Sequence, residues 1–303
     1  MSKTLNKEYE ASLKSIETEN FFDRKFYRPI GFRIAKWLCG TGITPNMVTI
    51  FSIFVGAAAG PLFFYDNIYI ILLGIFSLIA ANILDCVDGQ LARLSGIKSN
   101  FGRILDGLAG DIWFLSIYIF LALRLKNEFN SWLFFIPAVI SAISHIIQAN
   151  ITDYYKTLHL YFVSKEKGNE FHSLNELRLQ YNEMKPGAEK FLFKMYMGYT
   201  SLQESLTPKL QSFLNFLRSA YGDKIPDNIK EDYRRQSKRL MNNYLDLMTF
   251  NGRSIILFLA VLTGYVWIYF LYEIVILNII LVISIHKYEK VSAKNLIKLI
   301  TDN

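Results

Sequence analysis

Long apolar runs separated by short polar links make up most of this chain. The runs extend over roughly 47–65, 68–92, 100–124, 131–155, 252–268 and 271–287. A helix of about 20 apolar residues crosses the hydrocarbon core of a bilayer. The pattern therefore predicts an all-α integral membrane protein with six transmembrane helices. Because only a few residues around Tyr269–Glu273 separate the last two runs, one long kinked helix competes there with the helical hairpin that we expect.

Two polar or mixed segments precede the first run. Residues 1–19 are polar and lack the apolar core and cleavage site of a signal peptide, so we expect this end to stay in the cytoplasm. Residues 20–39 interleave aromatic and aliphatic side chains with basic ones, which is typical of an amphipathic helix lying on the membrane surface. The basic residues are Arg24, Lys25, Arg28, Arg33 and Lys36.

A charged segment at 156–251 has a helical pattern that Pro186, Pro208 and Pro226 interrupt. We interpret it as a cytoplasmic helical insertion. It could cover an active site or bind a partner, but charged helix faces are more often simply solvated, which favours a bundle against the inner membrane face. We therefore expect a polar N-terminal segment at 1–19 and the surface helix with four spans at 20–155. The insertion follows at 156–251, and two spans with a tail occupy 252–303.

The distribution of basic residues predicts the orientation. The link between the first two runs carries Asp66 and no Lys or Arg, and the link between the last two carries only Glu273. Basic residues are frequent on the opposite side, which the positive-inside rule assigns to the cytoplasm together with both termini. They include Arg93, Lys98, Arg103, Lys287, Lys290 and Lys294. Arg124 and Lys126, on the predicted outer side, are the exception.

Composition excludes several classes of protein. With 52% hydrophobic residues and only seven prolines, the chain is neither disordered nor collagenous. Cys39 and Cys86 cannot form a secreted disulfide framework and argue against zinc. A net charge of +7 would suggest nucleic acid in a soluble protein, but here the charges flank apolar runs, so we expect no nucleic-acid partner.

Four carboxylates lie inside or at the ends of apolar runs: Asp85, Asp88, Asp106 and Asp111. An ionised side chain there costs about 2.5–3.5 kcal/mol unless it is paired or hydrated. The second run enters from outside and the third returns, so all four belong near the cytoplasmic ends of neighbouring helices. Asp85 and Asp88, three residues apart, share one helical face. The topology predicts a single acidic site.

Carboxylates clustered without His or Cys suit a hard cation such as Mg²⁺, which commonly bridges phosphates. The alternative, in which these residues merely pair with Arg93 and Arg103, leaves two buried charges without a partner. Nearby small residues also fit phosphate chemistry. Gly89 and Ala92 leave space for a ligand beside the planar Arg93 cation, and Gly102 permits close helix packing.

These residues together form the pattern Asp85-x₂-Asp88-Gly89-x₂-Ala92-Arg93-x₈-Gly102-x₃-Asp106. This pattern resembles the signature D-x₂-D-G-x₂-A-R-x₈-G-x₃-D-x₃-D of the CDP-alcohol phosphotransferase (CDP-alcohol phosphatidyltransferase) family. The six-span layout, the preceding surface helix and a Thr-Pro-Asn-x-Val-Thr element at 44–49 extend the resemblance, which covers roughly 20–155 and, more loosely, 252–290.

The resemblance implies phospholipid synthesis, in which a phosphate-linked alcohol passes from a CDP-linked donor to a hydroxyl acceptor and CMP leaves. It implies two divalent ions, Mg²⁺ or Mn²⁺, held by Asp85, Asp88 and Asp106, with Asp111 as general base and further metal ligand. The implied CDP pocket is formed by Asn46, Thr49, Gly89, Ala92 and Arg93. A CDP-lipid such as CDP-diacylglycerol fits an inner-leaflet site, and dimers are common in the family, so a homodimer is one expected assembly.

The fourth carboxylate departs from the family pattern. The family position corresponds to Gly110, whereas the available residue, Asp111, lies five residues after Asp106. In a regular α-helix, five residues leave Asp111 about 140° from the Asp106 face. A single π-bulge, eased by Gly107 and Gly110, would bring both onto one face, and we predict such a distortion. The alternative is that Asp111 lies off the site and that the chain has lost or rerouted its general base.

The acceptor is less strongly specified. Arg103, Asp153 and Lys156 are candidates to bind a polyol or a phosphate, although each is also an ordinary polar residue at an inner interface. The overall resemblance favours the phosphatidylinositol or phosphatidylinositol-phosphate synthase branch, with inositol or inositol phosphate as acceptor. His145, in the fourth run, fits a hydrogen bond between helices better than a catalytic role.

Two other classes of protein compete with an enzyme. An ion or solute transporter would spread acidic residues through the membrane depth, whereas the fifth and sixth runs offer only Asn278 and Ser284 in their apolar cores. A catalytically impaired scaffold would not need the ordered Asp-Gly-Ala-Arg spacing. We therefore favour catalysis.

Overall fold

The computed structural model describes residues 3–15, 17–97, 99–163, 171–222 and 224–301. The described part of the chain consists of helices and connecting turns, without strands. The chain divides into two compact units. The first comprises Met1–Ile147 and Phe250–Leu277, and the second comprises Gln148–Thr249 and Asn278–Asn303.

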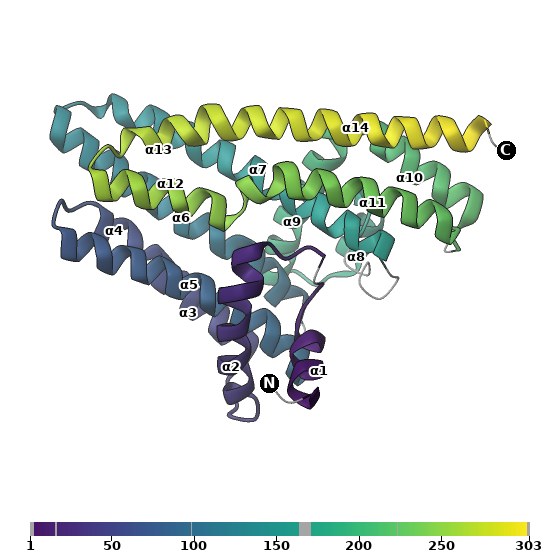
Figure 1. Cartoon of the computed structure of the whole chain (residues 1–303), viewed down its shortest axis with the longest axis horizontal. Coiled ribbons are helices and arrows are strands. Elements are labelled where there is room, and N and C mark those ends of the chain that lie inside the picture. The colour runs from purple at the N-terminus through teal and green to yellow at the C-terminus, as the bar shows by residue number, and fades with distance from the viewer. Residues whose placement is uncertain (1–2, 16, 98, 164–170, 223, 302–303) are drawn as a thin grey trace. The chain divides into compact units, whose positions relative to one another are not determined.

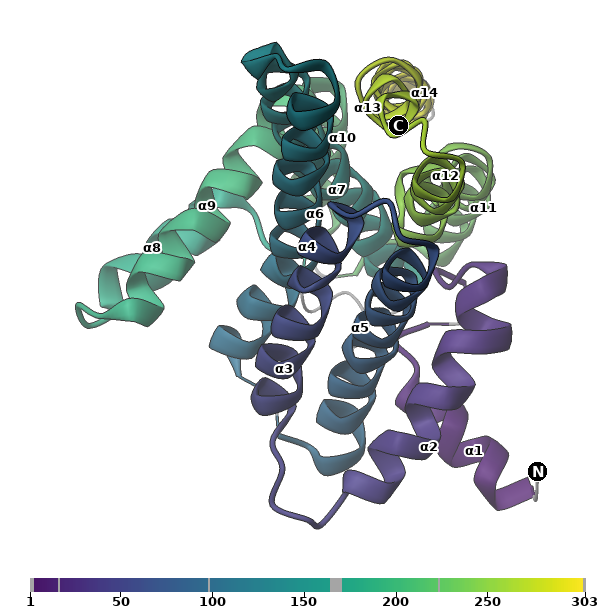
Figure 2. The same ribbon diagram turned by 90° about the vertical axis from the view of Figure 1, so that its left-hand side faces the viewer.

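The first unit contains the membrane helices that carry the acidic motif (Figure 1). Its elements are α1 (Lys3–Ser12), η1 (Asp23–Tyr27), α2 (Arg28–Leu38), α3 (Pro45–Ala57), α4 (Ala59–Phe63), α5 (Ile68–Ser95), α6 (Asn100–Phe129), η2 (Trp132–Phe134), the first half of α7 (Phe135–Val163), α12 (Phe250–Thr263), α13 (Trp267–Leu271) and η4 (Tyr272–Ile276). Within this unit α3 lies beside α5, and α2 packs against the other side of α5 (Figure 2). The predicted helix at 20–39 is present as η1 and α2, and its position on a membrane surface stays a prediction.

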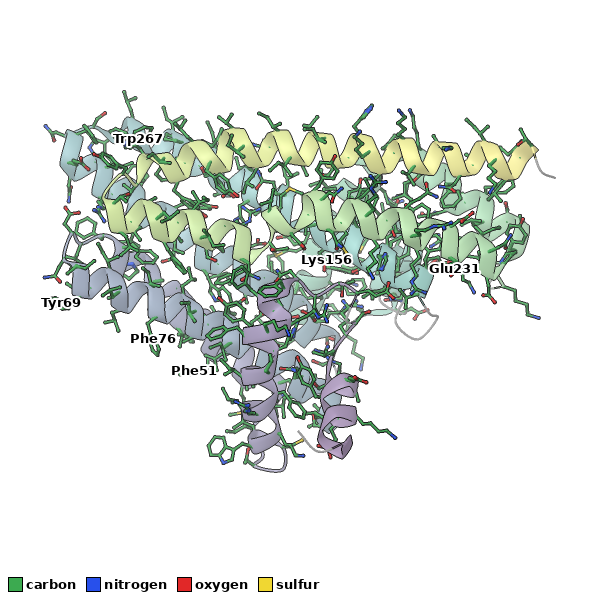
Figure 3. The ribbon with its side chains drawn as sticks, viewed as in Figure 1. Phe51, Tyr69, Phe76, Lys156, Glu231 and Trp267 are labelled. Atoms are coloured by element: carbon green, nitrogen blue, oxygen red, sulfur yellow. The ribbon has the colours of Figure 1, made fainter. Side chains whose placement is uncertain are left out.

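Among the residues that the structure describes, six helices are long and apolar enough to cross a membrane, which agrees with the predicted number. They extend over Pro45–Phe63, Ile68–Ser95, Phe101–Phe129, Trp132–Val163, Asp227–Thr263 and Trp267–Thr301. Large apolar side chains on α3 and α5, such as Phe51, Tyr69 and Phe76, point outward and are more than half exposed (Figure 3). Such faces suit lipid rather than water.

The last two spans are separate helices, as the hairpin prediction requires, but the link between them was placed wrongly. The break falls between Thr263 and Trp267, where Gly264 adopts a φ of +82° that other residues rarely tolerate. Glu273, which we assigned to this link, instead lies inside the final span and is fully buried. Apolar side chains flank Gly264 on both sides, so the hydropathy pattern does not mark the turn.

Arg124, one of the two exceptions to the charge rule, has a structural explanation. The Arg124 side chain is 6% exposed and forms an ion pair with Asp66. Its guanidinium also donates to the backbone carbonyls of Phe63 and Tyr65, at 3.2 and 3.4 Å. Arg124 therefore compensates the negative charge of Asp66, in the link between the first two spans, and does not add a separate positive charge on that side.

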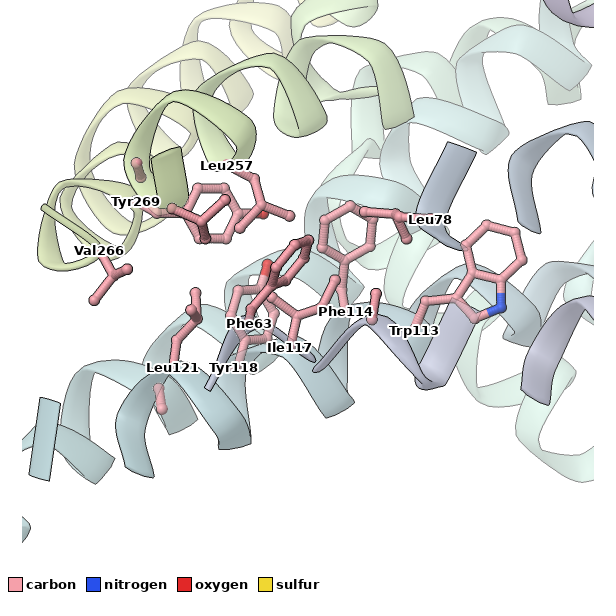
Figure 4. Close-up of a cluster of buried hydrophobic side chains, with 14 of the residues drawn as sticks. Phe63, Leu78, Trp113, Phe114, Ile117, Tyr118, Leu121, Leu257, Val266 and Tyr269 are labelled. Atoms are coloured by element: carbon pink, nitrogen blue, oxygen red, sulfur yellow. The ribbon is translucent and has the colours of Figure 1, made fainter. Parts of the chain in front are cut away.

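The core of the first unit holds α6 against the other membrane helices (Figure 4). Two glycines near the α3–α4 junction make this packing close. A methyl group on Gly56 would lie 2.3 Å from the Trp113 ring, and one on Gly60 would lie 2.8 Å from the Ser116 backbone. Small residues four apart are a common means of bringing membrane helices together. This contact fixes the helix that carries Asp106.

The second unit contains the predicted helical insertion. Its elements are the second half of α7, α8 (Leu174–Glu183), α9 (Ala188–Leu206), α10 (Pro208–Tyr221), α11 (Asp227–Tyr244), η3 (Leu245–Met248) and most of α14 (Leu277–Thr301). Pro208 begins α10 and Pro226 precedes α11, as the sequence pattern indicates. The α7 helix continues to Val163, so the expected boundary at 155–156 falls inside a helix.

Aromatic side chains and one helix cap hold the second unit together. The rings of Tyr155 and Tyr288 stack at 3.7 Å, and those of Phe162 and Tyr233 lie 4.4 Å apart. The Glu289 carboxylate accepts hydrogen bonds from the first two free backbone N–H groups of α10, at 2.8 and 2.9 Å. A carboxylate at this position also opposes the positive end of the helix dipole.

Candidate metal and nucleotide site

Three of the four predicted acidic ligands meet at one point in the first unit. Asp85 and Asp88 lie on one face of α5, and Asp106 lies on α6. One carboxylate oxygen from each lies within 4.8 Å of the other two. Asp88 is buried, Asp85 is half-buried and Asp106 is exposed. An all-oxygen donor set with one open side suits a hard divalent cation that also contacts a phosphate.

The start of α3 positions the buried member of this cluster. Thr44 caps the helix, Pro45 occupies its first turn, and one turn later the Thr49 hydroxyl donates to Asp88 Oδ2 at 2.6 Å. The carbonyl of Pro45 lies 3.1 Å from the same hydroxyl, but a hydroxyl has one proton and a carboxylate is the stronger acceptor. Thr49, predicted for the CDP pocket, thus contacts a predicted metal ligand.

We predict that Thr49→Val weakens metal binding. The change keeps the side-chain shape but removes the donor that fixes Asp88, and loss of such a supporting partner typically lowers metal affinity roughly 10–100-fold. Calorimetric titration with Mn²⁺ measures the effect. Ser52→Ala is the matched control, because Ser52 is a buried hydroxyl on the same helix that donates to the Thr49 carbonyl at 2.7 Å. Equal losses in both variants would contradict the assignment.

Gly102 allows α6 to approach the start of α3. A methyl group at this position would lie 2.2 Å from Asn46 Oδ1 and 2.9 Å from Ser99 Oγ. Ser99 also caps α6 by accepting from the Gly102 backbone N–H at 2.9 Å. The absence of a side chain at Gly102 therefore places Asn46, another predicted pocket residue, beside the first turn of the helix that carries Asp106.

The remaining motif residues follow Asp88 on α5. The Arg93 guanidinium lies over Gly89, where a methyl group would approach its Nη2 to 3.1 Å. Its Nε donates to the carbonyl of Ser12 at the end of α1, and Gln90 Nε2 donates to the Ser12 hydroxyl at 3.1 Å. Ala92 is half-buried on the same helix. A planar cation beside a position without a side chain can bind a phosphate.

A second cation lies near the cluster. Arg28, at the start of α2, pairs with Glu19 at 3.0 Å. Burial opposes its charged form, but the Glu19 carboxylate, which is hydrogen-bonded to it, and the nearby Asp85 raise the pKa of Arg28 above its ordinary value. Arg28 is therefore a permanent positive charge beside Asp85. The sequence analysis had assigned it only to the surface helix.

Comparison with known proteins supports the same region. Residues 42–167 match the family model described as CDP-alcohol phosphatidyltransferase. Over this segment the chain is similar to CDP-alcohol phosphatidyltransferases. The match begins after α2 and includes the acidic motif, so the signature and the domain coincide.

Three curated relatives are similar over shorter segments. The chain is 40% identical over 91 residues to an archaetidylinositol phosphate synthase from Pyrococcus horikoshii, which covers 30% of this chain and 47% of that protein. It is 39% and 37% identical over 70 residues to CDP-diacylglycerol–serine O-phosphatidyltransferases from two strains of Helicobacter pylori, which covers 23% of this chain and 28% of each relative. The chain thus spans about half the length of the first relative and about a quarter of the length of the other two.

The predicted distortion of the domain's third span is absent, and that prediction is wrong. The α6 helix is regularly α-helical from Asn100 to Phe129, including the stretch between Asp106 and Asp111. Asp111 therefore turns about 140° away from Asp106. Its Oδ1 atom lies 3.6 Å from His145 Nε2, and Asp111 is not a member of the three-carboxylate cluster. A methyl group on Gly107 or Gly110 would meet nothing within 4 Å, so no close contact at these two glycines distorts the helix.

His145 makes the hydrogen bond between helices that we expected, and it belongs to a larger buried polar network that the sequence analysis did not anticipate. Its Nδ1 atom lies 3.0 Å from Arg253 Nη1 on α12 and 3.0 Å from the Tyr118 hydroxyl on α6. Arg253 forms an ion pair with Glu273. The sequence analysis counted only Asn278 and Ser284 in the apolar cores of the last two runs, and it did not expect Arg253 and Glu273 to be buried there. A sequence feature could have predicted this network: Arg253 and Glu273 are charged residues at the ends of apolar runs, and such residues are often buried and paired.

The three acceptor candidates lie in different units. Arg103 is half-buried on α6 in the first unit, and in the second unit Asp153 is exposed and Lys156 half-buried on α7. Lys156 is labelled in Figure 3. A shared role for them stays a prediction.

Proposed function

We propose that this protein is a membrane enzyme of phospholipid synthesis that transfers a phosphatidyl group from a CDP-linked lipid to a hydroxyl acceptor and releases CMP. One observation carries the proposal. Asp85, Asp88 and Asp106, in the family's spacing and inside the matched domain, bring their carboxylate oxygens within 4.8 Å of one another. Clustered acidic residues at one membrane level are costly unless they bind a ligand.

The residues present fit divalent metal. The cluster offers three carboxylates, one of them fixed by Thr49, and no softer ligand from His or Cys. Asp85, Asp88 and Asp106 would hold the ions, Mg²⁺ or Mn²⁺ and two in number. Bound metal would neutralise the pyrophosphate and stabilise the departing CMP.

The chain's own side chains have distinct roles in the proposed transfer. Arg93 and the open position at Gly89 bind the nucleotide phosphate. The acceptor oxygen attacks the phosphorus that carries the lipid, the bond from that phosphorus to the CMP oxygen breaks, and Asp111 takes the acceptor proton.

The acceptor we favour is inositol or inositol phosphate. The relative from Pyrococcus horikoshii, whose name includes inositol phosphate, supports this choice, whereas the Helicobacter pylori relatives are named for serine. Of the three acceptor candidates, Arg103 is the one that we propose here, because it belongs to the same unit as the acidic cluster. The basic residues at the ends of the spans favour a site that faces the cytoplasm. A homodimer is the proposed assembly.

The test is CMP release by the purified protein in lipid nanodiscs. CDP-diacylglycerol and Mg²⁺ are supplied with inositol, inositol phosphate, glycerol phosphate or serine in separate reactions. We expect release with one acceptor and loss of release when EDTA removes the metal, with recovery on excess Mg²⁺. Release that is insensitive to EDTA would overturn the metal assignment, and no release with any acceptor would overturn the proposed donor.

A further inference from the structure

One face of the last helix, α14, changes from apolar to basic along its length. Ile279, Ile283, His286 and Lys290 follow one another at spacings of four, three and four residues, so they lie along one line of the helix. All four side chains are exposed. The two isoleucines suit lipid, and the basic residues follow where the apolar run ends (yellow helix in Figure 1).

The basic part of this face forms one wall of a groove in the second unit. The groove encloses about 340 Å³, and Lys209 at the start of α10 lines it together with His286, Lys290 and Lys294 of α14. Ligand pockets usually have volumes of about 300–1,000 Å³. Lys209 is remote from α14 in the sequence, so helix packing, and not a local run of charge, brings these basic groups together.

The groove has an excess of positive charge. No carboxylate among the described residues pairs with Lys209, Lys290 or Lys294. Glu289 also lines the groove, but its carboxylate already accepts the backbone N–H groups of Lys209 and Leu210, at 2.8 and 2.9 Å. The positive end of the α10 dipole compensates that negative charge. The three ammonium groups are therefore available to an anionic ligand, and lysine is a common ligand of phosphate.

The position of the groove favours a lipid headgroup over a soluble anion. The headgroup layer of a bilayer is about 5–8 Å thick on each side of the hydrocarbon. The helix rises about 6 Å from His286 to Lys290, which matches that layer. Side chains of a helix lean toward its N-terminus, which for α14 is the apolar end, so Lys290 and Lys294 lean toward the headgroups.

We propose that this groove binds the headgroup of an anionic phospholipid whose acyl chains lie along the apolar part of α14. His286 and the three lysines contact the phosphate, and Ile279 and Ile283 contact the hydrocarbon. The acidic cluster in the first unit has the opposite charge, and without metal it repels an anionic lipid. The groove is therefore a lipid site beyond the proposed transfer reaction.

Native mass spectrometry of the purified protein tests the proposal. The protein in detergent is titrated with phosphatidylglycerol in the presence of EDTA, so that no metal at the acidic cluster contributes to binding. We expect Lys209→Ala combined with Lys290→Ala to lower the affinity about 20–30-fold, because each basic residue at an anionic lipid surface contributes about fivefold. An unchanged affinity would overturn the proposal.

Lys287→Ala is the matched control. Lys287 is also an exposed lysine of α14, but it lies about 100° further round the helix than His286 and does not line the groove. We expect this variant to lower the affinity by less than about twofold, because the Lys287 charge acts through water. If Lys287→Ala lowers the affinity as much as Lys290→Ala does, overall charge accounts for the binding and the groove does not.

Two further ligands distinguish a lipid from a free phosphate. Phosphatidylcholine with the same acyl chains is zwitterionic, so it should bind more weakly than phosphatidylglycerol and equally to the wild-type protein and the double variant. Glycerol phosphate has the anionic group without acyl chains, so at equal concentration it should not displace phosphatidylglycerol. Equally tight binding of phosphatidylcholine would exclude the role of charge, and displacement by glycerol phosphate would exclude the role of the apolar face.

Thermal unfolding in detergent separates lipid binding from folding. The substituted lysines are exposed, so without added lipid the double variant should unfold at the wild-type temperature. Phosphatidylglycerol should raise the midpoint of unfolding of the wild-type protein and not that of the double variant. Equal stabilisation of both proteins would place the lipid elsewhere and overturn the proposal. Neither measurement depends on CMP release, so its outcome is independent of the proposed function.

Discussion

Asp106→Asn is expected to abolish CMP release. The substitution removes one negative charge from the three-carboxylate cluster and changes the side-chain volume very little. Without that charge the cluster binds divalent cation weakly, and the developing charge on the leaving group is not stabilised. We expect activity to fall by a factor on the order of 10³. Assays of CMP release with increasing Mg²⁺, together with Mn²⁺ titration, measure both effects.

The fold should survive this change. Asp106 is exposed, and substitutions at exposed positions typically alter the free energy of unfolding by about 0.5 kcal/mol or less. Asp227→Asn is the matched control, because Asp227 is a fully exposed aspartate on α11 that pairs with Lys230 at 3.4 Å. It should keep wild-type activity. Full activity of Asp106→Asn would exclude Asp106 as a metal ligand.

The largest expected loss of stability follows from Arg253→Met. The change leaves the carboxylate of Glu273, which is 0% exposed, without its counter-charge. Removing one partner of a buried ion pair typically costs about 3–5 kcal/mol, because the remaining charge is isolated in a medium of low dielectric constant. We expect a clear fall in the midpoint of thermal unfolding, measured in detergent micelles by intrinsic fluorescence.

The double variant Arg253→Met with Glu273→Met separates charge from packing. Replacing both partners with apolar side chains of similar size is often nearly neutral, so most of the lost stability should return. If the double variant is as unstable as Arg253→Met, the loss arises from packing. If Arg253→Met unfolds at the wild-type temperature, the ion pair contributes nothing to stability.

The spans and the acidic site were accessible from local sequence. Six apolar runs predict six helices because a bilayer selects segments by length and hydropathy alone. The sequence predicts that Asp85, Asp88 and Asp106 lie close together. Helix periodicity fixes which residues share a face, and antiparallel spans return to the same membrane level. The order of the fixed residues then identified the domain that the family match confirms.

The turn before the last span and the network around His145 were not accessible in this way. Gly264 ends a helix between two apolar stretches, so hydropathy does not mark the position, and Glu273 was therefore placed outside the membrane. Its partner Arg253 lies 20 residues earlier, on a helix whose rotation no local pattern fixes. Which buried charges face one another depends on helix packing.

The sequence by itself thus determined the class of protein, the six spans and the meeting of Asp85, Asp88 and Asp106, because these depend on composition, periodicity and spacing within single helices. It also placed Asp111 at that site, which the structure does not. Only the tertiary structure decided that α6 stays regular, that Asp111 faces His145, and that Arg253 meets Glu273. Those outcomes depend on how helices rotate and pack against one another, which is set by close contacts such as those of Gly56 and Gly60 with α6.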